Sequence, residues 1–156
     1  MTRRKRRGRD SSVHGLRLDE RARRTERVIE RYRAKPFAWQ GANCIRLARA
    51  QARAMGHQVP PVPLFRSALG ARRALKAEGF DTVAAMLAAY YPRLPAPAFM
   101  LVGDLCVMAD DDDGSGIEPI CVADGQGNLF GWHGEDPSRL WAIKFAMADV
   151  ACAWRL

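Results

Sequence analysis

Hydrophobic positions recur at helical spacing through the first hundred residues of the chain. The first such segment, residues 19 to about 35, is predicted to be a helix with Asp19 as its N-cap. Its apolar stripe consists of Val28, Ile29 and Tyr32, with Ala22 and Thr25 nearby. Arginine and glutamate alternate on the remaining positions, a pattern typical of a solvated face with weak ion pairs. Pro36 ends the helix, because the residue before a proline is pushed out of the α region.

Three more helices follow in the sequence. Asn43 is a good N-cap for a helix from Cys44 to Met55, and Gly56 stops that helix. The apolar face of this helix consists of Ile45, Ala48, Ala52 and Met55. Its basic face consists of Arg46, Arg49 and Arg53. The third helix is predicted to begin at Ser67, its candidate N-cap, and to end at Gly79. The fourth is predicted to have Asp81 as its N-cap and to be stopped by Pro92.

The pattern changes after residue 100, where short β-like runs replace helical periodicity. The runs are "MLVGDLCVMA", "EPICVAD", "GNLFGWHG", "LWAIKFAMA" and "VACAWRL", separated by turn signals such as "DDDDGSG" and "DGQGN". Helices first and strands later predict an α+β domain, with helices packed on one face of a mainly antiparallel sheet. A chain of 156 residues suits one such domain.

Charge is distributed unevenly along the chain, whose formal net charge is +8. Residues 1–40 carry 14 Lys/Arg against 5 Asp/Glu, residues 41–100 carry 8 against 2, and residues 101–156 carry 3 against 10. We expect residues 1–18 to form a disordered basic arm. Its cations are Arg3, Arg4, Lys5, Arg6, Arg7 and Arg9. Such an arm is either a solubilising tail or a binding segment for an anionic partner.

Nucleic acid is the weaker choice of partner for this arm. The cations would bind phosphates without base specificity, but no aromatic residue is interleaved for stacking, and the last third of the chain is acidic. The longest apolar run, "PAPAFMLV", is too short to cross a bilayer, and no apolar segment follows the basic start as in a signal peptide. These features predict a soluble chain with no membrane span.

Cysteine placement provides the main chemical signal. Three of the four cysteines lie in apolar, strand-like stretches, where buried and reduced thiols are expected: Cys106, Cys121 and Cys152. The spacings of the four cysteines match no common zinc pattern. The acidic run before Gly114 does not fit the calcium-loop template, and the sequence has no cofactor motif. Cys44 instead opens a helix, where unpaired N–H groups and the macrodipole favour the nucleophilic thiolate. The alternative is a small core residue that points into the sheet.

The stretch "KPFAWQGANCIRLARAQ" resembles the W-G-x-x-D-C opening of the NlpC/P60 cell-wall peptidases, a papain-like family. A phage- and prophage-encoded branch is more similar still, through "FRSALGARRALKAEGF", "GDL", a β-hairpin and the closing "AWR". The resemblance covers residues of about 24 to 156. It implies a single papain-like domain at residues 19–156, no cofactor, and a place in a virion tail after synthesis in a bacterial host cytoplasm.

The resemblance also implies site residues. Cys44 would attack an amide of a peptidoglycan stem peptide, and the start of its helix, with Asn43 in place of the usual aspartate, would help to hold the oxyanion. Ile117 or Glu118 occupies the usual position of the catalytic histidine, so either His133 on the next strand or another residue would be the base. The alternative for His133 is a surface histidine in a turn near Gly134. Strand alternation places His133 on the face of Leu129 and Gly131, and Phe130 and Trp132 on the other.

Two hypotheses therefore remain open at the level of sequence. The first is a cysteine peptidase that opens the cell wall during genome entry, with Cys44 and His133 as its catalytic pair. The second is a catalytically inactive tail-tip or baseplate protein, which keeps the fold and uses its basic arm to bind neighbouring tail subunits.

Overall fold

The computed structural model describes residues 15–109, 115–133, 136–144 and 147–156. The cations of the predicted basic arm and the predicted acidic hairpin loop at 110–114 lie outside the described residues. The helical elements are α1 (Leu18–Tyr32), α2 (Cys44–Ala54), α3 (Ala68–Ala77), α4 (Val83–Tyr90), η2 (Pro97–Phe99) and η3 (Met147–Asp149). The strands are β1 (Leu105–Met108), β2 (Ile120–Ala123), β3 (Asn128–His133), β4 (Asp136–Lys144) and β5 (Val150–Trp154).

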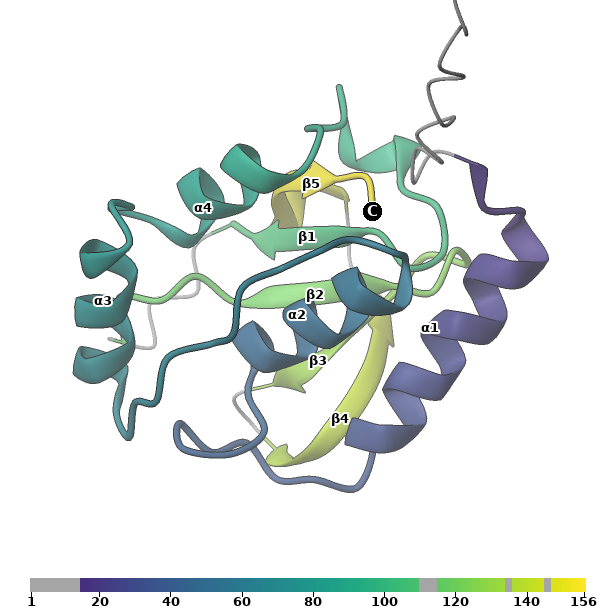
Figure 1. Cartoon of the computed structure of the whole chain (residues 1–156). Helices are drawn as coiled ribbons and strands as arrows, with labels where there is room; N and C mark the ends of the chain where they lie inside the picture. The colour runs from purple at the N-terminus through teal and green to yellow at the C-terminus, as the bar shows by residue number, and fades with distance from the viewer. Residues whose placement is uncertain (1–14, 110–114, 134–135, 145–146) are drawn as a thin grey trace, which may run out of the picture.

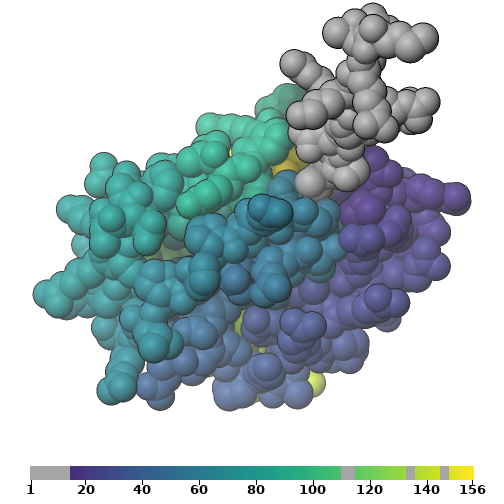
Figure 2. Space-filling view, in the orientation of Figure 1, coloured from purple at the N-terminus to yellow at the C-terminus, as the bar shows by residue number. Residues whose placement is uncertain are grey.

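The five strands form one sheet in the order β4-β3-β2-β1-β5, and every neighbouring pair is antiparallel. Helix α2 lies in front of this sheet, with α1 on one side of it and α3 and α4 on the other (Figure 1). In the space-filling view of the same face, α1 forms one flank and the segment with α3 and α4 forms the other (Figure 2). The predicted α+β class with an antiparallel sheet is confirmed.

The two faces of the sheet are covered by different sets of side chains. The face toward the helices contributes Leu105, Val107, Ile120, Val122, Phe130, Trp132 and Trp154 to the main core. The opposite face carries a second cluster, with Cys106, Cys121, Ala123, Leu129 and Ala153 among its members. Strands β1 and β2 are therefore buried along their whole length, which explains why they read as continuous apolar runs in the sequence.

Helix α1 departs from its prediction in two respects. Its N-cap is Arg17, which makes no side-chain capping bond, whereas Asp19 lies in the first turn and forms ion pairs with Arg17 and Arg23. Ala22 is exposed, and Arg21 is buried in its place. The cap prediction was wrong because the helix begins before Asp19. The prediction for Ala22 was wrong because hydrophobicity patterns place an arginine on the solvent side, whereas here the buried Asp104 pairs with Arg21.

The caps of the other helices are better determined by local sequence. Ser67 accepts a hydrogen bond from the Gly70 amide at 3.0 Å, as predicted for the start of α3. Helix α4 is capped by Thr82 and not by Asp81, because the Thr82 hydroxyl accepts from the Ala85 amide. The predicted cap was therefore one residue too early.

Asn43 is an unusual cap because it is fully buried. Its Oδ1 accepts from the Arg46 amide at 3.0 Å, which confirms its predicted role at the start of α2. Its Nδ2 donates back to carbonyl groups of the preceding loop, those of Ala38, Trp39 and Gly41, at 3.2–3.4 Å. One side chain thus holds both the helix start and the loop that leads into it.

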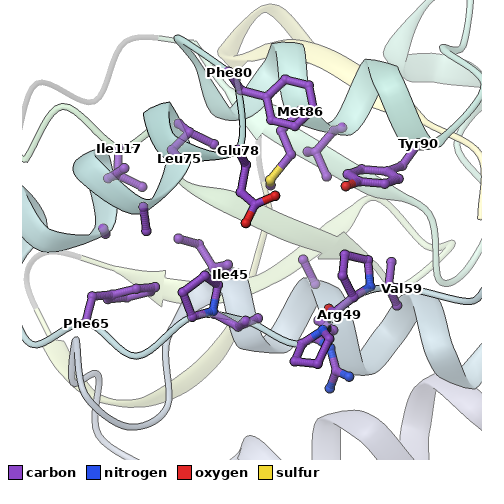
Figure 3. A pocket seen from close by; sticks show the side chains of 18 of the residues that line it. Ile45, Arg49, Val59, Phe65, Leu75, Glu78, Phe80, Met86, Tyr90 and Ile117 are labelled. Atoms are coloured by element: carbon purple, nitrogen blue, oxygen red, sulfur yellow. Dashed lines mark hydrogen bonds between the residues drawn. The ribbon is translucent and has the colours of Figure 1, made fainter.

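A groove on the helical side separates α2 from the α3–α4 pair (Figure 3). The proline-rich segment 59–65 forms one of its walls. Its lining is almost entirely aliphatic and aromatic, with Arg49 and Glu78 as the charged members.

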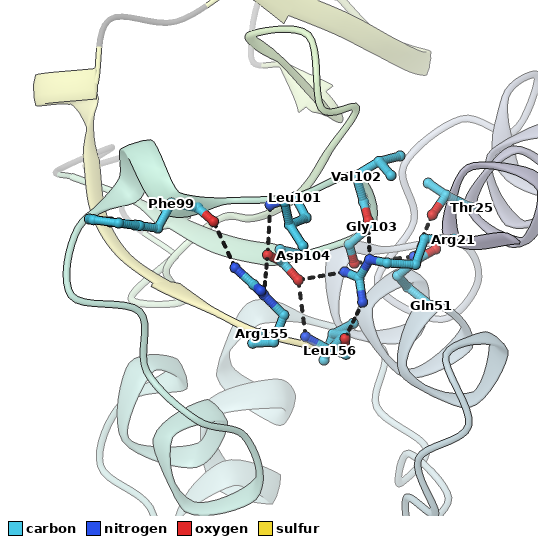
Figure 4. Close-up of polar contacts among 10 residues, drawn as sticks. All are labelled: Arg21, Thr25, Gln51, Phe99, Leu101, Val102, Gly103, Asp104, Arg155 and Leu156. Atoms are coloured by element: carbon cyan, nitrogen blue, oxygen red, sulfur yellow. Dashed lines mark hydrogen bonds and ion pairs between the residues drawn. The ribbon is translucent and has the colours of Figure 1, made fainter. Parts of the chain in front are cut away.

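Asp104, from the "GDL" motif, is the buried polar centre of the fold (Figure 4). Its Oδ1 accepts from Arg21 Nη2 at 2.6 Å and from the Leu156 amide at 3.1 Å. Its Oδ2 accepts from Arg155 Nε at 2.9 Å and from the Leu101 amide at 2.8 Å. Four donors from three separate segments therefore meet at one carboxylate.

Arg21 extends this network toward neighbouring main chain. Its Nε donates to the Val102 carbonyl at 2.9 Å, and its Nη1 donates to the Leu156 carbonyl. Burial lowers the pKa of Arg21, and the charge of Asp104 opposes that effect. The interaction with Asp104 therefore compensates part of the cost of placing a guanidinium in the core.

Replacing Asp104 with alanine is expected to reduce the free energy of unfolding by about 3–5 kcal/mol, because Arg21 would stay buried without a counter-charge. The change is measured by urea denaturation. The matched control is Asp19→Ala, which removes a carboxylate that is 56% exposed and should change the free energy by less than about 0.5 kcal/mol. Similar losses in both variants would contradict a central role for Asp104.

Replacing Asn43 with aspartate keeps the capping oxygen but removes the N–H groups that bind the loop carbonyls. We expect the free energy of unfolding to fall by about 1–3 kcal/mol, since buried acceptors lose their partners. The control is Ser67→Asp at the exposed cap of α3, where Ser and Asp are nearly equivalent and the change should stay within about 0.5 kcal/mol. An Asn43→Asp variant as stable as this control would show that the loop bonds are unimportant.

Candidate functional site

Cys44 is the first residue of α2, where the sequence placed it. The side chain belongs to the main core and is 9% exposed. The Ile120 amide, at the start of β2, is hydrogen-bonded to the thiol, and Cys121 follows it. The helix start is therefore pressed against the sheet and does not open to solvent.

Burial raises the pKa of the Cys44 thiol to about 11. Hydrogen bonds from the amides of Ile120, Cys44 and Ile45 act in the opposite direction, and these include the helix N-terminal groups that were expected to favour the thiolate. The cost of removing a thiolate from water is larger than their combined effect. Burial, and not the helix start, therefore sets the direction in which the pKa of Cys44 departs from its ordinary value.

The two residues at the usual histidine position have other roles. Glu118 Oε1 accepts from the Val83 amide at 2.8 Å, so its carboxylate binds the start of α4. Ile117 is buried and lines the groove between the helices. Glu118 is therefore engaged with α4, and Ile117 is part of the apolar lining of the groove.

His133, the candidate base, is the last residue of β3, and its main chain pairs with Asp136 beyond an irregularity that follows Gly131. Its side chain lies outside the part that the structure describes, so a pair of Cys44 and His133 stays a prediction. Earlier in β3, Phe130 and Trp132 pack on the core that contains Cys44, and Leu129 packs on the opposite face.

Both polar atoms of the Asn43 side chain are hydrogen-bonded. Oδ1 accepts from the Arg46 amide, and Nδ2 donates to carbonyl groups of the loop before α2. A donor to an oxyanion has to be directed at the reacting carbonyl oxygen. The Nδ2 group of Asn43 is instead directed at main-chain carbonyls. In this structure Asn43 braces the loop and caps the helix.

Aromatic side chains pack together at the approach to Cys44, an arrangement that sequence reasoning missed. The Phe37 ring contacts those of Trp39 and Trp132, with centroids 5.0 and 5.9 Å apart, and Tyr32 also contacts Trp132. Trp132 Nε1 donates to the Lys35 carbonyl at 2.8 Å, which fastens the loop to β3. The aromatic residues were visible in the sequence, but their convergence across 97 positions was not.

The predicted arginine face of α2 is not uniform. Arg53 is exposed, whereas Arg49 is half-buried and its Nε donates to the Pro60 carbonyl at 2.8 Å. Arg46 is also half-buried, and its Nε and Nη2 atoms have no hydrogen-bond partner among the described residues. The three arginines therefore lie in different surroundings.

Two further properties concern the described residues alone. Their His, Cys, Asp and Glu side chains form no group of three or more that could hold a metal ion. Within the same ranges, no helix has the length and apolar character needed to cross a membrane.

Comparison with solved structures identifies the fold. The P60 domain of an antigen from M. avium paratuberculosis matches with a TM-score of 0.52 and 16% sequence identity, over 91% of this chain and 99% of that one. RipD from Mycobacterium tuberculosis, described as a non-catalytic NlpC/p60 domain protein with an adaptation to peptidoglycan-binding function, matches with a TM-score of 0.47 and 13% identity. That second match covers 90% of this chain and 98% of RipD.

The first of these similarities confirms the predicted NlpC/P60-like fold. No curated protein matches the chain by sequence. A sequence family matches residues 16–156, which include every described helix and strand. The chain therefore belongs to the family described as "Domain of unknown function (DUF6950)".

Proposed function

We propose that this protein is a phage or prophage tail component that has an NlpC/P60-like fold and does not hydrolyse peptide bonds through Cys44. The burial of Cys44, which raises the pKa of its thiol to about 11, supports the absence of hydrolysis. The tail location is supported by the resemblance of "SALGARRALK" and "ACAWRL" to the phage-encoded branch.

The chemistry of thiol nucleophiles explains why burial is decisive. A thiol with a pKa of about 11 is ionised to roughly one part in 10⁴ at pH 7, against a few parts per hundred for a free thiol of pKa ~8.5. A substrate carbonyl also has to reach the sulfur of Cys44, a residue that is only 9% exposed. Both the reactive species and its access are therefore reduced.

The surroundings of Cys44 support the same conclusion. Glu118 is engaged in capping α4, and Ile117 is part of an apolar wall. Trp39, on the approach loop, packs against Phe37 and Phe65 and is half-buried. These contacts suit a structural helix start better than an open cleft.

In this role, residues 19–156 act as a single domain within a tail tip or baseplate, and the arm at residues 1–18 contacts acidic neighbouring subunits. The arm's charge supports this proposal, because its six cations within positions 3–9 would attract an acidic protein surface. The proposed location is accordingly the virion tail.

One observation favours a peptidase as the second candidate. Cys44 opens a capped helix of an NlpC/P60-like fold, and three main-chain amides donate to its sulfur and favour the thiolate. In that candidate, Cys44 attacks an amide of a peptidoglycan stem peptide, and His133 accepts the thiol proton. The acyl-enzyme is then released by water.

Alkylation of Cys44 by iodoacetamide, followed by peptide mapping, distinguishes the two candidates. For a thiol of pKa about 11, we expect slow modification at pH 7 and a rate that rises about tenfold per pH unit up to pH 10 without a plateau. The same measurement on urea-unfolded protein provides the free-thiol profile, with a plateau above pH ~8.5.

The His133→Ala variant is the second arm of this experiment. It should leave the alkylation profile of Cys44 unchanged, and neither wild type nor Cys44→Ala should release new amino groups from purified peptidoglycan. Rapid alkylation at neutral pH that slows in His133→Ala, together with Cys44-dependent release of amino groups, would favour the peptidase.

A further inference from the structure

The groove between α2 and the α3–α4 pair is an apolar feature of the described surface that the proposed function does not use. Its walls include Ile45, Val59, Phe65, Leu75, Met86 and Tyr90, whose side chains point into it (Figure 3). The space inside is about 110 Å³, somewhat below the roughly 150 Å³ of an apolar cavity that accepts benzene. It therefore has room for most of one large aliphatic or aromatic side chain, because a groove, unlike a closed cavity, lets part of that side chain remain outside.

This groove is separate from the thiol of Cys44. Ile45 lines the groove, whereas Cys44, the preceding residue, lies in the core beside β2. Binding in the groove thus requires no reaction at the cysteine, and the inference is independent of the proposed function.

Two charged side chains are placed for recognition of a peptide main chain. Arg49 lies on the α2 wall, where its bond to the Pro60 carbonyl fixes its position. Glu78, the C-cap residue of α3, projects into the groove from the opposite wall (Figure 3). Neither forms an ion pair within the part of the chain that the structure describes. A peptide offers carbonyl groups to an arginine and N–H groups to a carboxylate.

The net charge of the segment around the groove favours a ligand of negative charge. Residues 44–93, the segment from which most of the lining comes, contain eight Lys/Arg and two Asp/Glu, of which Arg49 and Glu78 line the groove itself. A net positive field of this kind attracts acidic segments and repels basic ones. The rim also exposes apolar surface that a ligand would cover, since Leu64 is 91% and Tyr90 is 44% exposed.

We propose that this groove binds a peptide segment of a partner protein, in which one large apolar side chain is flanked by Asp and Glu residues. The apolar side chain enters the groove, Arg49 and Glu78 bind the peptide main chain, and the surrounding arginines attract the acidic flanks. Three properties of the ligand are therefore specified: the size of its apolar side chain, the hydrogen-bonding groups of its main chain, and its negative charge.

A designed probe tests this proposal with the full-length protein. The probe is a fluorescein-labelled nine-residue peptide with a central phenylalanine, two leucines and six acidic residues, and its matched control has lysine at those six positions. By fluorescence anisotropy, the acidic peptide should bind at least about tenfold more tightly than the lysine peptide, and added salt should reduce the difference.

Methyl NMR locates the binding site. The unlabelled acidic peptide should shift the methyl resonances of Ile45, Met86 and Ile117, which line the groove, and leave that of Ile143 on β4 unchanged. Arg49→Gln should weaken binding about tenfold, as expected for a lost charge-assisted hydrogen bond. Arg73→Gln, which removes an exposed charge of α3 outside the groove, should weaken it less than about twofold.

Several outcomes would overturn the proposal. These are absence of saturable binding up to millimolar peptide, equal affinity for the two peptides, equal effects of the two arginine variants, or shifts confined to residues outside the groove. Groove methyl shifts that depend on protein concentration in the absence of peptide would assign the groove to a second copy of this chain, and would overturn it as well.

Discussion

The carboxylate of Asp104 is the constraint on which the packing of this protein depends. A charge that is fully buried must be paired and hydrogen-bonded, because its desolvation is otherwise too costly. Arg21 from α1, Arg155 after β5 and two main-chain amides satisfy it. The first helix, the start of the first strand and the end of the last strand are therefore fixed relative to one another.

Helix α2 packs closely within this frame. Gly103 precedes Asp104 with a φ of 87°, and a Cβ there would lie 2.6 Å from Thr25 Oγ1 and 2.7 Å from Gln51 Nε2. Gln51 Nε2 also donates to Thr25 Oγ1 and to the Gly103 carbonyl. A helix held this close to the sheet buries its own first residue, Cys44, and the resulting desolvation outweighs the helix-terminal amides.

The NlpC/P60-like fold and the surroundings of Cys44 are separate properties of this protein. Function depends on the particular side chains that a fold presents and on their access to solvent. Here Cys44 at the helix start is packed in the core, whereas the adjacent residues Ile45, Ala48 and Arg49 of the same helix line the apolar groove.

Local patterns in the sequence were sufficient for the α+β class, the antiparallel strands, the caps at Asn43 and Ser67, and the position of Cys44 at a helix start. Such features depend on residues within a few positions of one another, as periodicity and capping do. Tertiary structure alone decided that Arg21 is buried, that Cys44 is inaccessible, and that Trp132 meets the loop before α2. These outcomes depend on contacts between distant segments, because burial and electrostatic environment are properties of the assembled core and not of local sequence.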